Sequence, residues 1–136
     1  MKSVGFNFNK ISIEKFSDNF ENLKINTNID ILKIKEIKSD FIKPEEKIIV
    51  VEFNYIIDYD SKIAKIEFFG NILLTDKSKN IRDILKKWKN KKMSEDFRIN
   101  IFNLILRKSN LKAMQLEDEI NLPLHIPLPL LKKQKE

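Results

Sequence analysis

The chain lacks, or is poor in, several residue types on which enzyme chemistry depends. It contains no cysteine, which excludes disulfides, thiolate metal sites and a cysteine nucleophile. Its single histidine, His125, argues against a histidine-based catalytic triad and against a zinc site with several histidines. Its two glycines, Gly5 and Gly70, are too few for the phosphate-binding loops of P-loop and dinucleotide-binding proteins. We therefore expect a protein that is not an enzyme and that uses no cofactor or metal.

Long apolar runs are missing as well. No run approaches the roughly 18 residues that a membrane span requires. The N-terminus has no uninterrupted apolar segment of the kind found in secretory signals. Together with the absence of cysteine, which suits a reducing compartment, these features predict a cytoplasmic protein without a membrane span.

The overall composition is that of a folded domain. Hydrophobic residues make up 42% and charged residues 34% of the 136 positions, a length that predicts one domain with a sizeable core. The 26 basic and 20 acidic side chains give a net charge of +6. This balance permits contact with nucleic acid or acidic partners without requiring it, because a composition rich in Lys, Ile and Asn also follows from coding bias.

The most regular pattern lies in residues 46–75. Apolar side chains occupy the odd positions of 49–57 and then the even positions of 64–74, the period of two that marks half-buried strands. The two faces coincide in an antiparallel hairpin that we expect to place Phe53 opposite Phe68. The other face of this hairpin is apolar too, through Ile48, Val50, Ile56, Ile63, Phe69 and Leu73. A sheet that is apolar on both faces must be buried on both sides. The helices of one short chain are expected to bury one face, so the pattern predicts that a partner chain buries the other.

Two further strands are predicted before this hairpin. Residues 3–14 alternate with a change of parity near Asn9, which predicts a β-bulge. Residues 23–38 also alternate, with a second change of phase at Leu32. Pro44 marks a loop between this strand and the hairpin.

Two helices are predicted after the hairpin, where the apolar period changes to 3.6. The first is expected to begin at a cap on Ser78 and carries the stripe Ile81, Ile84, Leu85 and Trp88. The second begins at a cap on Ser94 and runs to about Leu116, with apolar residues over a wide arc. The predicted fold class is α+β, a four-stranded antiparallel sheet followed by a short and then a long helix.

The chain ends in an apolar tail, residues 120–131. Pro123, Pro127 and Pro129 exclude a helix or a central strand there, so the tail is expected to be extended. We predict a single domain over 1–131, followed by a frayed basic end at 132–136.

Two groups of residues suggest chemistry, and each has a simpler interpretation. Trp88 within the lysine-rich run 86–92 could stack on and neutralise a nucleic-acid strand, but it also belongs to an apolar stripe of the kind that usually packs in a core or interface. The acidic run 117–119 could bind a metal together with His125, but its spacing fits no zinc pattern, and a solvated acidic helix end explains it.

We expect the function to reside in exposed apolar surface that can hold segments of other proteins. The residues predicted to contact such polypeptides are Phe41, Ile42, Leu122, Leu124 and Ile126. The residues predicted to form an interface between copies of the chain are Ile81, Ile84, Leu85 and Trp88. A nucleic-acid-binding module that uses the helix at 86–92, or a structural subunit of a fixed complex, is the alternative.

Parts of the sequence resemble the SecB-like chaperones. The opening run 6–12, Phe-Asn-Phe-Asn-Lys-Ile-Ser, is similar to the first strand of that family. Phe97-Arg98, followed by Ile101, Leu104 and Ile105, is similar to the start of its long helix. The predicted order of four strands, a short helix, a long helix and an apolar end containing proline also matches across nearly the whole chain.

The resemblance implies an ATP-independent holdase that binds unfolded or export-competent polypeptides. It also implies a homo-oligomer, a dimer or a dimer of dimers. Members of the family dock on the translocase motor through an acidic surface, whereas this chain is basic. Relatives of the family also act on toxin–antitoxin systems, so both kinds of client remain open.

Overall fold

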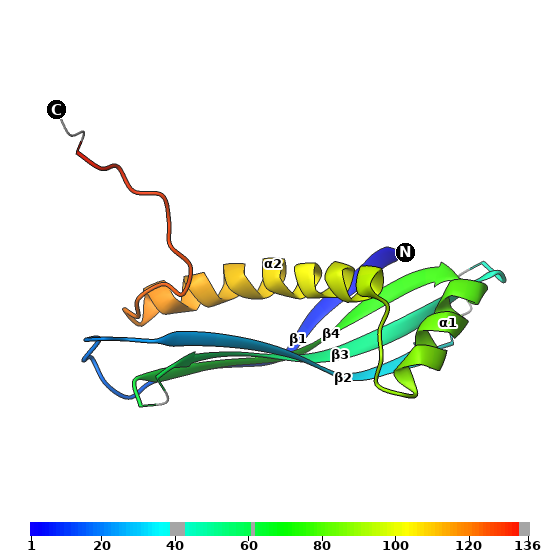
Figure 1. Ribbon diagram of the computed structural model, residues 1–136, viewed down its shortest axis with the longest axis horizontal. Helices are drawn as coiled ribbons and strands as arrows, with labels where there is room; N and C mark the ends of the chain where they lie inside the picture. The colour runs from blue at the N-terminus through cyan, green and yellow to red at the C-terminus, as the bar shows by residue number, and fades with distance from the viewer. Residues whose placement is uncertain (39–42, 61, 134–136) are drawn as a thin grey trace.

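One antiparallel sheet and two helices make up the computed structural model, which describes residues 1–38, 43–60 and 62–133. The elements are β1 (Lys2–Lys15), β2 (Ile25–Ile37), β3 (Glu46–Tyr59), β4 (Ala64–Lys77), α1 (Ser78–Trp88) and α2 (Glu95–Glu119). The strand order is β1-β4-β3-β2, so β1 and β2 form the two edges (Figure 1). This arrangement confirms the predicted α+β class and the predicted order of elements.

The register of the central hairpin differs from the prediction by two residues. Phe53 lies opposite Gly70, and Tyr55 rather than Phe53 lies opposite Phe68. Gly70 explains the shift, because a Cβ atom added there would lie 2.9 Å from Phe53 Cζ and 2.4 Å from the carbonyl oxygen of Asn7. The position opposite the Phe53 ring therefore requires glycine. A shift of two residues leaves every side chain on its predicted face.

Both predicted irregularities of the edge strands are present. The pairing of β1 with β4 shifts between Phe8 and Lys10, and the pairing of β2 with β3 shifts between Ile31 and Lys33. A further shift, between Ser3 and Gly5, was not predicted. Such bulges bend and twist an edge strand.

Both helices pack on the same face of the sheet (Figure 1). On that face the side chains of Ile49–Tyr59 at odd positions and Ala64–Leu74 at even positions are essentially inaccessible. Ile81 of α1 and Phe97, Ile101 and Ile105 of α2 join them in one core. The opposite face carries half-buried Ile48, Ile56, Phe69 and Leu73, and no helix among the described residues covers it.

The helix starts are only partly as predicted. The Ser94 hydroxyl caps α2 by accepting a hydrogen bond from the Phe97 amide at 3.3 Å. Ser78, in contrast, is the first helical residue of α1 and caps nothing. The Ser78 amide donates to the carbonyl oxygen of Glu45 at 2.9 Å, and Asp76 Oδ1 accepts hydrogen bonds from the Lys77 amide at 2.7 Å and from Asn80 Nδ2 at 3.1 Å.

The long helix continues beyond its predicted end, without a break, to Glu119. The tail after Asn121 is neither helix nor strand, and beyond Ile126 it leaves the body of the molecule (Figure 1). None of the helices in the described part of the chain has the length and apolar character to cross a membrane.

Candidate functional site

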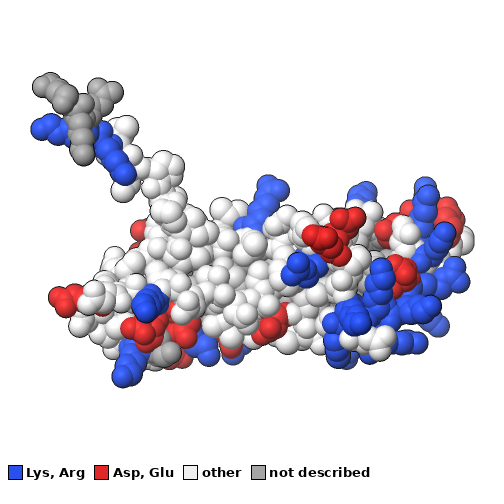
Figure 2. Space-filling model, in the orientation of Figure 1, with Lys and Arg blue, Asp and Glu red and all other residues white. Residues whose placement is uncertain are grey.

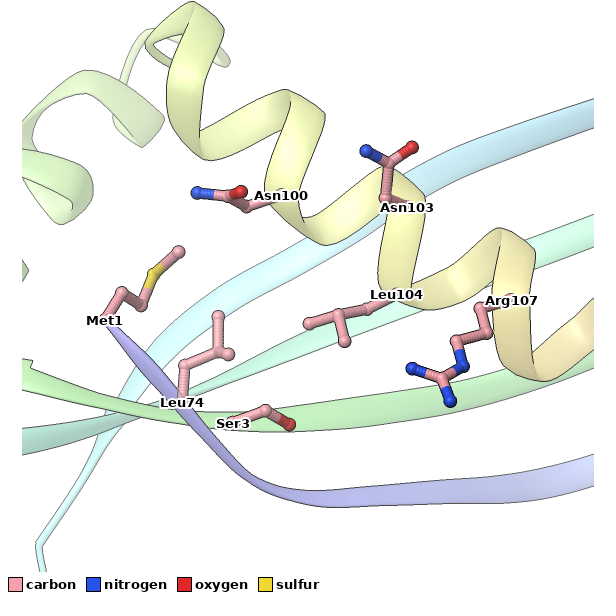
Figure 3. Close-up of a pocket in the computed structure, with 7 residues that line it drawn as sticks. All are labelled: Met1, Ser3, Leu74, Asn100, Asn103, Leu104 and Arg107. Atoms are coloured by element: carbon pink, nitrogen blue, oxygen red, sulfur yellow. The ribbon is translucent and has the colours of Figure 1, made fainter.

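A cleft of about 400 Å³ opens between the first residues of β1 and the first half of α2. Its lining consists of Met1, Ser3, Leu74, Asn100, Asn103, Leu104 and Arg107. Figure 3 shows Leu104 extending from α2 toward Leu74, with Met1 at one end of the cleft and Arg107 at the other. The lining is therefore apolar at its centre, with amides and a guanidinium at its rim.

Beyond the cleft, apolar side chains continue along β1 and α2, because α2 runs beside β1 in the same direction (Figure 1). The first half of α2 lines the cleft together with Ser3, and the end of α2 is joined to the end of β1 by a 2.9 Å hydrogen bond from Lys15 Nζ to the Ile120 carbonyl oxygen. Leu111 lies seven residues after Leu104 and therefore on the same side of the helix. Its side chain is 64% exposed.

The facing row on β1 is also apolar. Ser3, Phe6, Phe8 and Ile11 pair with residues on the covered face of β4, so their side chains point to the side on which α2 lies. Phe6 and Phe8 are half-buried against the Phe53 ring, with ring centroids 5.4 Å and 6.5 Å from it, and Ile11 is 45% exposed. We call this surface the β1–α2 groove and define it by Met1, Ser3, Phe6, Phe8, Ile11, Leu74, Leu104 and Leu111.

The backbone of β1 adds a second means of binding along this groove. β1 is an edge strand, and within the described ranges no strand pairs with its outer side. An edge strand presents unpaired N–H and C=O groups to which an extended segment can add as a further strand. A long edge beside apolar side chains can therefore hold both the main chain and the side chains of a peptide.

A buried polar cluster lies under the far half of α2, where the tail turns back on the sheet. Glu117 is fully buried, and both of its carboxylate oxygens lie 2.9 Å from Nδ1 of His125, whose side chain is 2% exposed. His125 Nε2 lies 2.8 Å from Asn110 Oδ1, which also accepts a hydrogen bond from the Tyr55 hydroxyl. The Tyr59 hydroxyl donates to Glu117 Oε2.

Burial perturbs both tyrosines of this cluster. Desolvation, and secondly the charge of Glu117, raise the pKa of Tyr55 to about 12. Desolvation and the hydrogen bond with Glu117 also raise the pKa of Tyr59 above its ordinary value. Both phenols therefore stay protonated near neutral pH and act as hydrogen-bond donors. The cluster shows no nucleophile paired with a base in an open cavity, so its geometry is that of a structural network.

This network holds the start of the tail in the fold. The Tyr59 hydroxyl lies 2.7 Å from the carbonyl oxygen of Pro123, and Leu122 is 6% exposed in the core. Over residues 128–133, the last that the structure describes, the tail shows no such anchor. Leu128, Leu130 and Leu131 are 51%, 81% and 105% exposed.

Comparison with known proteins relies on structure alone. No protein-family model matches this sequence, and neither does any curated protein. One similar solved structure is Rv1957, a SecB-like chaperone of Mycobacterium tuberculosis, in complex with a ChAD peptide from the HigA1 antitoxin. The match has a TM-score of 0.51 and covers 98% of this chain and 92% of that chain, at 9% sequence identity. This chain has the SecB-like fold.

Within the SecB-like fold of this chain, the predicted peptide-binding residues occupy different environments. Phe41 and Ile42 lie outside the described residues. Leu122 belongs to the core, because the turn after α2 directs it inward. Leu124 and Ile126 are half-buried beside it and retain accessible surface.

The residues predicted for an interface between copies are similarly divided. Ile81 is completely buried by its own sheet and offers a partner no surface, because the first turn of α1 packs directly on the core. Ile84, Leu85 and Trp88 are half-buried against the same core and remain partly accessible. Lys91 Nζ lies 4.7 Å from the centroid of the Trp88 ring.

Sequence reasoning missed the two main features of the site. The β1–α2 groove depends on which strand forms the edge next to α2, and local patterns do not reveal strand order. Glu117 was interpreted as part of a solvated acidic helix end. A signal was available, since Glu117 continues the four-residue spacing of the buried positions Phe97, Ile101, Ile105, Ser109 and Ala113.

Proposed function

We propose that this protein is an ATP-independent holdase that binds non-native polypeptide segments along the β1–α2 groove. The observation that carries the proposal is an exposed apolar groove beside an unpaired edge strand, in a chain with the fold of a peptide-bound chaperone. Holding a polypeptide needs no covalent step, so the proposal requires neither a catalytic residue nor a cofactor. The proposed location is the cytoplasm.

The binding energy would come from removing apolar surface of the client from water. Such burial stabilises by roughly 25 cal/mol per Å², less the entropy lost when a flexible segment is ordered. Ile11, Leu104 and Leu111 supply apolar contacts that do not require one particular sequence. Leu124 and Ile126 at the tail, with Phe41 and Ile42, remain candidates for further contacts.

We also propose that the protein is a homo-oligomer, a dimer or a dimer of dimers. The open face of the sheet supports this, because Ile48, Ile56, Phe69 and Leu73 lie there without a helix over them. Half-buried Ile84, Leu85 and Trp88 on α1 are candidates for the same role. The peptide bound by the M. tuberculosis chaperone comes from an antitoxin, which makes antitoxin segments one class of proposed client. Export-competent chains, which the resemblance to the SecB-like chaperones implies, are the other.

The decisive experiment measures mass by light scattering, with and without a permanently unfolded test protein. We expect a dimer or tetramer that forms a complex with the unfolded protein and ignores its folded form. The combined variant Ile11→Ser, Leu111→Ser should lose most of this binding. Leu32→Ser is the matched control, because Leu32 is 44% exposed on the opposite edge strand.

Two results would reject the proposal. A wild-type protein that takes up no unfolded chain is not a holdase. A groove variant that binds as well as both the wild type and the Leu32→Ser control would show that clients bind elsewhere.

A further inference from the structure

Nearly all of the net charge of the chain is concentrated at one end of the fold. Residues 77–92 contain eight of the 26 basic side chains and a single acidic one, Asp83, so this segment carries +7 while the whole chain carries +6. The remaining residues are therefore close to neutral as a group. We call the eight residues the α1 basic cluster: Lys77, Lys79, Arg82, Lys86, Lys87, Lys89, Lys91 and Lys92.

The basic side chains of the cluster lie on the surface, and few of them pair with an acidic side chain. All eight side chains are exposed, and Figure 2 shows a concentration of Lys and Arg side chains at the α1 end of the molecule. Over the described ranges, Lys87 is the one member that forms an ion pair, with Asp83 at 3.3 Å. The helix explains the position of its four members, Lys79, Arg82, Lys86 and Lys87, because its apolar stripe packs on the sheet and these residues lie on the exposed side. Uncompensated charge of one sign attracts a partner of the other sign.

The cluster adjoins the mouth of the β1–α2 groove. Met1 lines the cleft at the start of the groove and also lines a second hollow, together with Lys2, Val4, Lys43, Glu46, Thr75, Asp76 and Lys77. Lys77 is the first residue of the cluster. Asp76 in this hollow is already engaged, by the N-terminal amine at 3.5 Å and by Asn80. Thr75 and Lys77 occupy odd positions of β4, so this hollow lies on the open side of the sheet and meets the groove only at the edge formed by β1. The other members of the cluster lie on α1 and on the link to the start of α2, at the same end of the molecule as the cleft (Figure 1). An extended chain that leaves the groove at this end therefore comes close to the cluster.

The chemistry of the two surfaces together selects a class of partner. The groove is apolar and the cluster is cationic, so an occupant of both must be apolar along one stretch and anionic along the next. A polypeptide can have that composition, whereas a nucleic acid is uniformly charged and gains nothing from the groove. Nucleic-acid strands also bind through aromatic platforms, and here the Trp88 ring packs on the core with Lys91 over it.

We infer that the α1 basic cluster receives the acidic flank of a client polypeptide whose apolar segment lies in the β1–α2 groove. The inference rests on the proposed holdase function and adds the class of client, an apolar segment followed or preceded by several Asp or Glu residues. Steering by exposed charge acts mainly on the association rate, by roughly 10-fold to 1,000-fold, and it falls as salt screens the charges.

The test compares three fluorescent peptides that share one apolar segment and differ in an acidic, a neutral or a basic flank. Anisotropy titrations at low and high salt give the affinities. At low salt the wild type should bind the acidic-flank peptide about 10-fold or more tightly than the neutral one, and this preference should disappear at high salt.

Two charge variants locate the effect. The combined variant Lys79→Gln, Lys86→Gln, Lys89→Gln lowers the charge of the segment from +7 to +4 and should lose most of the preference for the acidic-flank peptide. The control Lys24→Gln, Lys62→Gln, Lys65→Gln makes the same change of charge at exposed positions beside the β3–β4 turn, at the end of the sheet opposite α1, and should keep the wild-type preference. Circular dichroism checks that both variants are folded.

The outcomes separate this inference from the proposed function. Equal binding of the acidic and neutral peptides would overturn the inference and leave the holdase proposal standing, as would an unchanged preference in the α1 variant. Failure to bind any peptide would overturn both. An oligonucleotide of equal charge that binds as tightly as the acidic-flank peptide would overturn the choice of a polypeptide partner.

Discussion

The imidazole of His125 and the carboxylate of Glu117 meet in the interior of the protein, with Nδ1 at 2.9 Å from both carboxylate oxygens. His125 belongs to the tail and Glu117 to α2, so this contact closes the last turn of the chain onto the long helix. Both side chains are almost completely removed from water. Polar groups in such a position stabilise the fold only while each has its partner.

Replacing Glu117 by Gln should destabilise the protein by about 1–3 kcal/mol, because the His125 and Tyr59 groups lose the carboxylate that binds them. Urea unfolding measures the change. Asp118→Asn is the control, since Asp118 is exposed on the adjacent helix position and its replacement should leave stability nearly unchanged. Equal stability of the two variants would show that the buried network contributes nothing.

Alkaline titration should report directly on this network, because the only two tyrosines of the chain, Tyr55 and Tyr59, are both in it. The pKa of Tyr55 rises from 10.0 to about 12 in the folded protein, and that of Tyr59 also rises. The unfolded chain then loses these protons at lower pH than the folded one. The contribution to stability is complete below pH 10 and is lost as the pH rises toward 12.

Phenolate absorbance of the folded protein should therefore stay low around pH 10 and appear only at higher pH or with unfolding. The same titration in urea provides the control, in which both tyrosines should ionise in their ordinary range. A folded protein that ionises a tyrosine near pH 10 would contradict the buried network.

Gly70→Ala should destabilise the sheet by about 1–3 kcal/mol, the usual cost of overpacking. The added Cβ would lie 2.4 Å from the carbonyl oxygen of Asn7, which is backbone and cannot move aside. Gly5→Ala is the matched control in the same sheet, because its Cβ would meet only the movable Cδ1 of Leu73 at 2.9 Å. Thermal unfolding of both variants decides whether the Gly70 position is sterically required.

Two serines, Ser94 at the N-cap of α2 and Ser109 within the helix, should respond to alanine in opposite directions. Ser94→Ala removes the cap on the Phe97 amide and should cost about 1 kcal/mol. Ser109 is buried, and in the described part of the chain its hydroxyl has no hydrogen-bond partner. Ser109→Ala should be neutral or stabilising by up to about 1 kcal/mol, because it removes an unsatisfied polar group and improves helix propensity. Chemical denaturation of both variants tests this contrast.

In the central hairpin, the alternation of apolar and polar residues predicted the faces of the strands but not their register. Alternation placed Phe53 and Tyr55 on the buried face correctly, since the period of two assigns faces without knowledge of the partner strand. The register was wrong by two residues, because both registers bury the same faces. The choice between them depends on the space above Gly70, which the Phe53 ring and the β1 backbone fill together.

In the long helix, too, the local feature was predicted from the sequence and the contact with distant segments was not. Its cap at Ser94 was predicted correctly because capping depends on residues three apart in the sequence. The burial of Glu117 was not predicted, because its partners Tyr59 and His125 come from a strand and from the tail. A carboxylate is driven to the surface unless such partners surround it, and only the folded arrangement supplies them.

The amino-acid sequence by itself determined the α+β class, the faces of the strands, the two bulges and the apolar stripe of α1, because each follows from contacts between residues close together in the chain. The tertiary structure alone decided the strand order, the hairpin register, the Glu117 network and the β1–α2 groove. Each of these joins segments distant in sequence, and whether their side chains fit is settled only when the segments pack against one another.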